Sequence, residues 1–287
     1  MKQQSDMLTA PIGRTIIGLA APNVISMIVL LITLVAEAWY IGQMGTVALA
    51  GLALVFPMFM LIMMLSAGSV GGAITGVVAQ KLGAGNRSGA EVLAFHAVLL
   101  AVFLAAISGF IFLTAGDWAY SALGGSGAVL DEALLYSDLF FTGCLSMWLA
   151  NALAAIARAT GHMKVVATCL ITGSVVQLVA GGLLIFGLGF FPKMGMSGAA
   201  AAAVIGYSVG ALMLLYFLMR KCSELRLTFS GIAIKLMPMV NILRVGALSS
   251  VNPFCTWAAV IAITAFMARY GVDMLAGTAL VHAWNFC

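Results

Sequence analysis

The feature that most constrains this chain is a series of long, unbroken apolar segments. A helix needs about 20 apolar residues to cross a bilayer, and segments of that size occupy residues 16–41, 47–79, 92–115, 133–157, 165–190, 199–219 and 240–268. An eighth segment begins near residue 274 and is cut off by the C-terminus. The segments are continuous and lack the ten-residue alternation of barrel strands, so they predict membrane-spanning helices.

Composition indicates the same class. Of the 287 residues, 63% are apolar and 8% are charged, which leaves too little charge to cover a water-facing surface. The N-terminal residues lack a small-residue cleavage site, so the first segment is predicted to be a retained span and not a signal peptide. The five cysteines lie mostly within apolar segments, without a CxxC or a His/Cys cluster. They predict buried free thiols, with no metal site, disulfide framework or cofactor.

The basic residues predict the orientation. If the N-terminus lies in the cytoplasm, eleven of the thirteen Lys and Arg residues fall in cytoplasmic segments, and only Lys193 and Arg269 fall outside. Cytoplasmic loops of membrane proteins carry an excess of Lys and Arg. We therefore expect a multi-pass protein of a bacterial-type inner or plasma membrane with its N-terminus in the cytoplasm.

Small residues predict where helices touch. Gly68, Gly72 and Gly76 repeat every four residues, and SGAAAAAV at 197–204 forms a second smooth face. Such faces let helix backbones approach closely in a bilayer. The alternative is that glycine is simply common in membrane helices.

An internal repeat suggests that the chain is built from related units. GTVALAGLALV at 45–55 recurs as GVDMLAGTALV at 271–281, with seven of eleven positions identical. Many transporter folds consist of two repeated halves. Two units of about 226 residues would exceed the chain by about 165 residues. The expectation is therefore a truncated product that ends inside its eighth helix.

The first span carries a narrow polar stripe. At 100° per residue, its polar side chains fall within about 80° of one another. A polar stripe on a membrane helix must face a cavity or another helix. The residues of the stripe are Thr15, Asn23, Ser26, Thr33 and Glu37.

Glu37 is the clearest acid within a predicted span. A carboxylate at depth costs on the order of 3 kcal/mol on insertion scales, and because this cost falls on the ionised form, the group could take up and release protons. The alternative is a carboxylate that reaches the outer interface, since Trp39 and Tyr40 beside it are residue types of the interface. We expect a coupling role for Glu37.

At this point the sequence resembles a known family. EAWYIGQMG at 37–45 followed by ALAGLAL is similar to the first-helix motif of the multidrug and toxic compound extrusion (MATE) transporters, with Glu37 in place of the usual Asp. Pro22 matches a proline found in one branch of that family, where it would bend the helix. QKLGAGN at 80–86, RATG at 158–161 and the 184–202 region resemble further family segments. The matching loop residues are Gly83, Gly85, Asn86, Arg158 and Gly161.

The resemblance implies an all-α membrane fold of twelve helices in two six-helix lobes around a central cavity. It also implies export of organic, often cationic, compounds in exchange for protons or sodium. Two departures stand out. The Asn-x-x-x-Asp pair of helix five reads Gln177 and Gly181 here, and a helix-seven glutamate corresponds to Cys255. Proton coupling through Glu37 alone is then the simpler expectation, with sodium left open.

Other polar residues are candidates for the cavity wall. Gln177 and Ser174 could line it from helix five and Asn151 from helix four, although interhelical hydrogen bonding explains them equally well. His96 and His162 are predicted to be packing and loop residues without ligand-type neighbours. GAGN at 83–86 is predicted to be a tight turn, since it lacks the strand and helix that a phosphate-binding loop needs. We find no nucleophile and base pairing, and so expect no enzyme.

Together these inferences predict a six-helix lobe at residues 1–220, a cytoplasmic linker at 221–239 and the start of a second lobe at 240–287. The expected function is a proton-coupled, or sodium-coupled, antiporter that exports small organic cations or other xenobiotics, without nucleic acid partners and as a monomer when full length. One alternative is a truncated remnant that does not transport. Another is a flippase for lipid-linked precursors, which should have a strongly basic central cavity.

Overall fold

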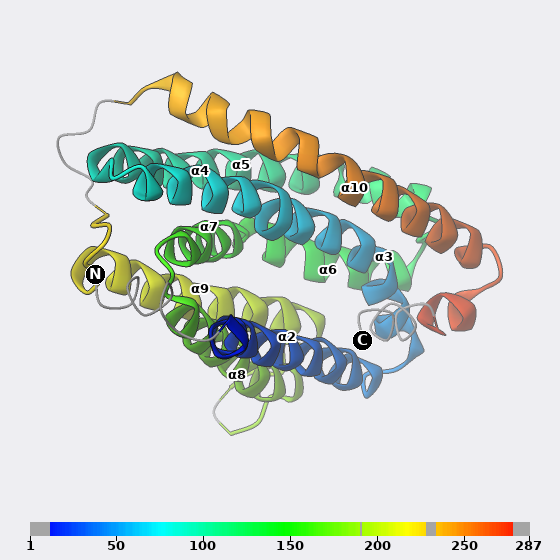
Figure 1. The fold of residues 1–287 in the computed structure, drawn as a ribbon. Helices are drawn as coiled ribbons and strands as arrows, with labels where there is room; N and C mark the ends of the chain where they lie inside the picture. The colour runs from blue at the N-terminus through cyan, green and yellow to red at the C-terminus, as the bar shows by residue number, and fades with distance from the viewer. Residues whose placement is uncertain (1–11, 190, 228–233, 278–287) are drawn as a thin grey trace.

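The computed structural model describes residues 12–189, 191–227 and 234–277, and side-chain positions from residue 20 onward. Within these ranges all regular secondary structure is helical (Figure 1). The helices are α2 (Ile12–Gly42), α3 (Thr46–Met63), the π-helix η1 (Met64–Val70), α4 (Gly71–Gly83), α5 (Arg87–Ala122), α6 (Ala128–Thr142), α7 (Leu145–Ala159), α8 (Met163–Phe186), α9 (Met196–Arg220) and α10 (Leu236–Ala268).

These helices are long and apolar enough to be membrane spans. Six described helices meet that standard, with α3, η1 and α4 forming one span, and α6 with α7 can form a seventh. A helix satisfies its own backbone hydrogen bonds, which is why it suits a bilayer. The turns after α4, α7 and α9 lie at one end of the bundle (left in Figure 1), as alternating spans require. The predicted spans are thus present as helices, and the protein is an all-α, multi-pass membrane protein.

Two spans are irregular near the middle of the bundle. The second span contains the π-helix η1, whose wider turn leaves room for side chains to bond to the backbone. Ser66 Oγ donates to the carbonyl oxygen of Met63 at 3.0 Å. The fourth span bends by 51° between α6 and α7, where a Cβ on Gly143 would lie 2.5 Å from Val204 of α9. The bend lets α6 and α7 follow different neighbours.

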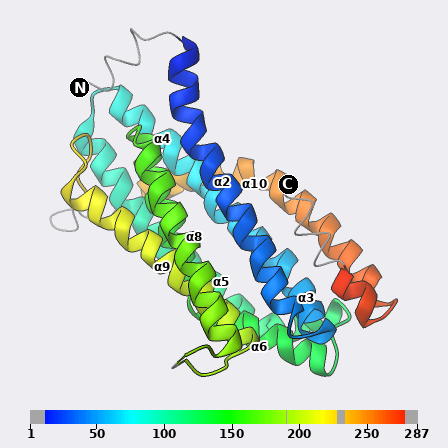
Figure 2. The same ribbon diagram turned by 90° about the horizontal axis from the view of Figure 1, so that it is seen from below.

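The closest helix pair is α8 and α9, which lie side by side in Figures 1 and 2. A Cβ on Gly173 would lie 2.7 Å from the carbonyl oxygen of Gly206, and a Cβ on Gly206 would lie equally close to that of Gly173. Gly198 belongs to the predicted smooth face at 197–204, and a Cβ on it would lie 2.8 Å from the carbonyl group of Leu184 on α8. Glycine therefore allows this pair of backbones to touch, as small residues do in membrane proteins.

The prediction that Gly68, Gly72 and Gly76 form a helix contact is wrong for the described part of the chain. Gly68, Gly72 and Gly76 are exposed, and a Cβ on any of them would have no neighbour within 4 Å. The neighbouring face of the helix, with Ala73 and Ile74, is the buried one. Spacing alone identifies a face of a helix but not the direction in which that face points.

Helix α10 packs on the outside of the six preceding spans and is mostly exposed. Gly246 would place a Cβ 3.5 Å from the carbonyl oxygen of Ser69, and the Trp257 ring lies 6.4 Å from that of Phe56. At the other end, His96 Nε2 accepts from the backbone N–H of Lys235 at 2.9 Å. These contacts join α10 to α3, η1 and α5.

The internal repeat is visible in the backbone. Gly45 precedes α3 with φ +119°, and Gly271 precedes a helix at 272–277 with φ +107°. Each glycine carbonyl accepts from the N–H four residues later, Leu49 at 3.2 Å and Leu275 at 3.1 Å. Positive φ is a conformation that glycine adopts without strain. The two copies thus begin their helices alike, up to residue 277, after which the repeat lies outside the described residues.

Candidate functional site

Glu37 lies on α2, five residues before the helix ends, and its carboxylate faces into the bundle. Tyr136 Oη of α6 donates to Oε1 at 2.9 Å, and Gln177 Nε2 of α8 donates to Oε2 at 3.1 Å. Each carboxylate oxygen therefore has a donor from a different helix. The alternative of a carboxylate that reaches the interface does not match this geometry, whereas Trp39, 59% exposed, does point outward.

Two small hollows meet at Glu37. The first lies between α2, α3 and α6 and is lined by Glu37, Phe56, Phe59 and Tyr136 among others. The second lies between α2, α8 and α9, where Glu37 is joined by Thr33 and Gln177. A half-buried carboxylate among apolar and aromatic groups requires the hydrogen bonds that the two donors supply. The acid is thus enclosed by protein on several sides.

A larger cavity of about 150 Å³ lies beside this acid. Gln177 lines both this cavity and the hollow at Glu37, so one amide side chain connects the two. Polar groups from α2, α7, α8 and α9 line the cavity, and Met27, Met63 and Leu170 provide apolar wall. The polar lining residues are Asn23, Ser26, Asn151, Arg158, Ser174, Gln177 and Tyr207.

Two polar side chains of the cavity wall are held by hydrogen bonds, one between helices and one within a helix. Asn151 Nδ2 donates to Ser66 Oγ of η1 at 2.8 Å, while Ser26 Oγ donates to the carbonyl oxygen of Asn23 at 2.8 Å. Asn151 therefore both lines the cavity and bonds between helices, and Gln177 does the same. Thr33 is 1% exposed, bonds to the carbonyl oxygen of Val29, and lies at the small hollow.

The loop residues of the resemblance lie at the ends of helices. Gly83 ends α4, Gly85 has φ +72°, and Asn86 caps α5 by accepting from the N–H of Gly89 at 2.8 Å. The predicted tight turn is present. Gly161 lies in the turn after α7 with φ +83°. Arg158 was expected in that loop, but it lies in the last turn of α7 and lines the cavity.

Pro22 lies inside α2, which continues on both sides of it as one helix. Proline removes one backbone hydrogen bond and crowds the preceding turn of a helix. Its role as the point where α2 bends stays a prediction.

Several functional candidates were not found from the sequence. Tyr136 and Tyr207 belong to apolar segments in which a tyrosine gives no signal of its own.

Cys255, at the position of the helix-seven glutamate, is exposed on α10. The prediction that His162 lacks ligand-type neighbours is wrong, because Cys222 and Glu224 place their ligand atoms within 4.8 Å of its ring nitrogen.

The fold and site define a polytopic helical membrane protein with a mainly apolar cavity that carries several polar side chains. The MatE family model matches residues 22–183, and the chain belongs to that family. Its fold is the six-helix lobe of a MATE-type transporter, with a seventh helix and the start of an eighth.

Relatives and solved structures resemble the chain over most of its length. The FAD transporter of Shewanella oneidensis is 30% identical over 77% of this chain and 49% of its own length. Probable multidrug resistance protein NorM of Thermotoga maritima is 26% identical over 93% of this chain and 57% of its own. The chain thus spans about half the length of these curated relatives.

Two solved structures share the fold. One is a MOP superfamily transporter from Pyrococcus furiosus, with a TM-score of 0.78 and 26% identity over 87% of this chain and 54% of that one. The other is a multidrug resistance MATE family transporter in an inward-facing conformation, with a TM-score of 0.79 and 25% identity over 85% of this chain and 55% of that one.

Proposed function

We propose that this lobe belongs to a proton-coupled antiporter that exports small organic cations, and that Glu37 is the group that carries the proton. Support comes from the position of Glu37, which is inside the bundle and is linked through Gln177 to a cavity that carries several polar side chains. An ionisable group inside a membrane helix that faces a cavity is a common element of proton pathways. Alternating access needs two lobes that move relative to each other, so the proposal concerns a protein that contains this lobe.

The hydrogen bonds suggest how the proton could change the cavity. An ionised carboxylate only accepts hydrogen bonds, and Glu37 accepts one on each oxygen. A proton on Oε2 makes that oxygen a donor and weakens it as an acceptor for the Gln177 amide N–H. Protonation then favours a Gln177 amide that turns its carbonyl oxygen toward the new donor, or one that turns toward the cavity that it lines. Protonation of Glu37 would therefore alter the wall against which a substrate lies.

The charge of Glu37 supports a cationic substrate. An ionised carboxylate close to the cavity attracts a positive charge, and a proton on the same group removes that attraction. Loading a proton and binding a cation then oppose each other, which is the requirement for exchange. By linkage, a proton that weakens cation binding is itself displaced by the cation.

A binding experiment tests this proposal on the chain itself. A fluorescent lipophilic cation should bind the purified protein in detergent, and its affinity should fall as the pH is lowered. Glu37→Gln should bind the dye with an affinity that does not change with pH. Asp131→Asn, which removes an exposed acid from the first turn of α6, should retain the pH dependence of the unmodified protein. A Glu37→Gln protein with the full pH dependence would remove Glu37 from the mechanism.

A second candidate substrate class is an anionic dinucleotide. The relative from Shewanella oneidensis is named an FAD transporter, and Arg158 places a positive charge at the cavity wall here. Arg is well suited to bind phosphate groups through paired hydrogen bonds. If FAD is the ligand, it should bind the protein more tightly than the cationic dye, and Arg158→Gln should weaken FAD binding without affecting the dye. This single basic residue gives less support to a flippase, which we expect to need a strongly basic cavity.

We also propose that the end of the bundle carrying the turns after α4, α7 and α9 faces the cytoplasm of a bacterial-type inner or plasma membrane. The excess of Lys and Arg in these segments supports this orientation. A reporter that is active only in the cytoplasm, fused after Arg220, should be active. Activity of an exported reporter at the same position would reverse the orientation.

A further inference from the structure

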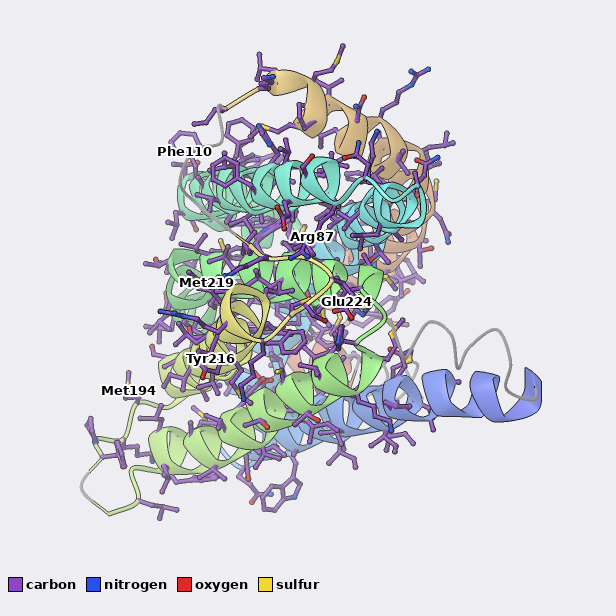
Figure 3. All side chains as sticks on the ribbon, turned by 60° about the vertical axis from the view of Figure 1, so that its left-hand side comes forward. Arg87, Phe110, Met194, Tyr216, Met219 and Glu224 are labelled. Carbon is purple, nitrogen blue, oxygen red and sulfur yellow. The ribbon has the colours of Figure 1, made fainter. Side chains whose placement is uncertain are left out.

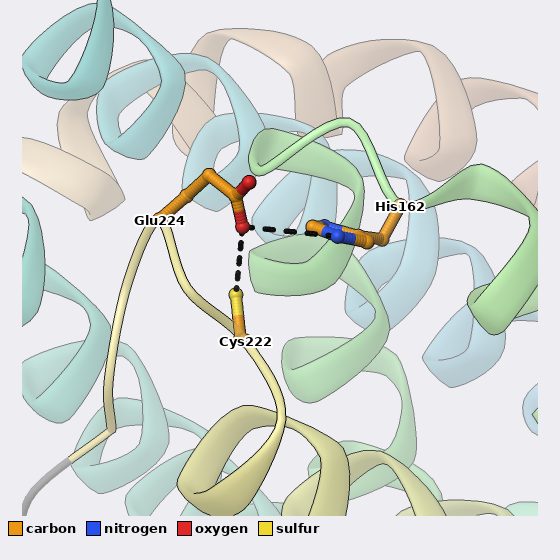
Figure 4. Close-up of side chains that lie close together, drawn as sticks. All are labelled: His162, Cys222 and Glu224. Atoms are coloured by element: carbon orange, nitrogen blue, oxygen red, sulfur yellow. Dashed lines mark hydrogen bonds and ion pairs between the residues drawn. The ribbon is translucent and has the colours of Figure 1, made fainter. Parts of the chain in front are cut away.

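Three side chains with ligand atoms meet at the end of the bundle where α7 and α9 finish (Figure 4). His162 lies in the turn between α7 and α8. Cys222 and Glu224 lie in the segment that follows α9. In Figure 3 Glu224 is seen at this end of the bundle, as is Arg87 at the start of α5. The cluster is separate from Glu37 and from the cavity beside it.

The segment that carries Cys222 and Glu224 is held in place by packing. Its backbone folds back on α9, with the N–H of Cys222 donating to Phe217 and that of Leu227 to Leu218. Leu225 and Leu227 are buried. The backbone N–H of Arg226 also donates to Glu91 of α5 at 3.2 Å. The two residues therefore face His162 from a fixed backbone and not from a free tail.

The Glu224 carboxylate contacts both other side chains, as an ion pair with His162 and as a hydrogen bond from Cys222, at distances that the ligands of one ion could also have. Glu224 Oε2 lies 3.7 Å from His162 Nε2 and 3.7 Å from Cys222 Sγ, and all three atoms lie within 4.8 Å of one another. An N–H···O hydrogen bond is usually 2.7–3.2 Å long. Ligands of one tetrahedral zinc ion, with bonds of about 2.0–2.3 Å, lie roughly 3.3–3.6 Å apart.

A neighbouring hydroxyl orients the histidine ring. Thr160 Oγ1 donates its hydrogen to the carbonyl oxygen of Ala157 at 2.8 Å, and it lies 2.9 Å from His162 Nδ1. Since the hydroxyl hydrogen is already used, the oxygen accepts from Nδ1–H. The neutral ring then has its lone pair on Nε2, which faces Glu224. Metal-binding histidines are commonly held in this way by a second partner on the other nitrogen.

We propose that His162, Cys222 and Glu224 form a binding site for one divalent transition-metal ion of the zinc type. The set of one imidazole nitrogen, one sulfur and one carboxylate oxygen is typical of zinc ligands. Cys222 is 7% exposed, and its thiol must lose a proton to bind a metal ion. Binding therefore replaces the S–H bond with a sulfur–metal bond and releases one proton, without any change of oxidation state. A water molecule completes the fourth position.

The bound ion would connect two segments that are sixty residues apart in sequence. The turn between α7 and α8 would be tied to the segment leading from α9 toward α10. An ion that binds the folded protein and not the unfolded chain stabilises the fold. The site thus predicts that the end of the bundle with the turns after α7 and α9 is more stable when metal is bound.

The experiment is a Co²⁺ titration of the purified full chain, in a background where Cys255 and Cys287 are replaced by serine. Co²⁺ bound to a thiolate gives a sulfur-to-metal charge-transfer band, which reports the ligand directly. We expect one Co²⁺ per chain with this band, displaced by one equivalent of Zn²⁺, and a higher thermal unfolding temperature with metal.

Variants assign the band to this cluster. Cys222→Ser should abolish the band, and His162→Asn and Glu224→Gln should each weaken Co²⁺ binding about tenfold or more. Thr160→Val, which leaves the ligands intact, should weaken it about 10–100-fold through the loss of the second partner. His96→Asn should leave binding unchanged, since that ring bonds to the backbone of Lys235.

Two results would overturn the site. One is the absence of a saturable charge-transfer band at one equivalent of Co²⁺. The other is a band that survives Cys222→Ser, which would assign the metal to a different cysteine. If the three variants unfold, the Thr160→Val and His96→Asn pair still decides, because equal Co²⁺ affinities in these two proteins contradict the proposed geometry.

Discussion

The two carboxylates Glu37 and Glu224 occupy contrasting settings at different places in the bundle. Glu37 lies within a span, and each of its oxygens accepts a hydrogen bond, at 2.9 and 3.1 Å. Glu224 lies outside the spans, and its Oε2 is 3.7 Å from both a nitrogen and a sulfur. Glu37 is contacted by two hydrogen-bond donors within 3.1 Å, whereas Glu224 contacts, at 3.7 Å, a nitrogen and a sulfur that are both atoms of metal-ligand type. The difference supports a proton as the ligand of Glu37 and a metal ion as the ligand of Glu224.

The setting of Glu37 also explains why it tolerates a position within a membrane span. A buried polar group without a partner costs much more than one that is hydrogen-bonded. The acid therefore depends on Tyr136 and Gln177, whereas Glu224 at the end of the bundle has partial access to water. Loss of a partner should be costly at Glu37 and nearly neutral at Glu224.

The largest expected effect of this contrast is at Gln177. Gln177→Leu removes the donor to Glu37 Oε2 and places an apolar group beside the carboxylate. We expect the free energy of unfolding to fall by about 1–3 kcal/mol, the cost of an unsatisfied buried group, as measured by chemical denaturation in mixed micelles. Gln43→Leu, at an exposed position after α2, is the matched control and should change little. Equal losses in both variants would contradict the role given to the bond.

A smaller effect is expected at Tyr136. Tyr136→Phe keeps the buried ring and removes only the hydroxyl that donates to Glu37 Oε1, so the free energy of unfolding should fall by about 0.5–1.5 kcal/mol. Tyr216→Phe removes a hydroxyl from a 58% exposed ring and serves as the control. If Tyr136→Phe is as stable as the unmodified protein, the bond contributes nothing to holding the acid.

At Glu224 the expectation is reversed. In the presence of a chelator, Glu224→Gln should change the free energy of unfolding by less than about 0.5 kcal/mol, as most surface substitutions do. Its effect should be seen only when metal is added, as a smaller rise in the unfolding temperature. A large loss of stability without metal would show that Glu224 is structural and would remove the contrast with Glu37.

A further small effect concerns the support of the Glu224 segment. Glu91 accepts from the N–H of Arg226 and pairs with Arg87 at 3.1 Å on a partly exposed surface. Exposed ion pairs of this kind contribute about 0.2–1 kcal/mol, so Glu91→Gln should lower stability by no more than that. It should weaken Co²⁺ binding slightly, because the segment that carries two ligands loses one anchor.

Much of the fold could be predicted from the sequence. Apolar segments long enough to span a bilayer coincide with the helices, because length and hydropathy are local properties. The position of Glu37 inside the bundle was also expected, since a charged group must avoid lipid. Its partner Tyr136 could not be identified, because the bend between α6 and α7 sets the direction of that side chain. The roles of the cavity residues and the division into lobes stay predictions.

The errors have a physical origin as well. The glycine stripe at Gly68, Gly72 and Gly76 follows one side of a helix, but the packing of neighbours decides which side is buried. His162 and Glu224 lie sixty-two positions apart in the sequence and share no motif, so only the fold of the segment after α9 brings them together. Contacts between distant segments leave no periodic signal in a single sequence.

The most direct test of the central claim is a count of protons released when a cation binds. In weakly buffered detergent solution with a pH indicator, saturating the protein with the fluorescent lipophilic cation should release protons at a pH where Glu37 is partly protonated. We predict a release that approaches one proton per bound dye as the pH is lowered, and none from Glu37→Gln. Equal proton release from the unmodified protein and from Glu37→Gln would contradict the account.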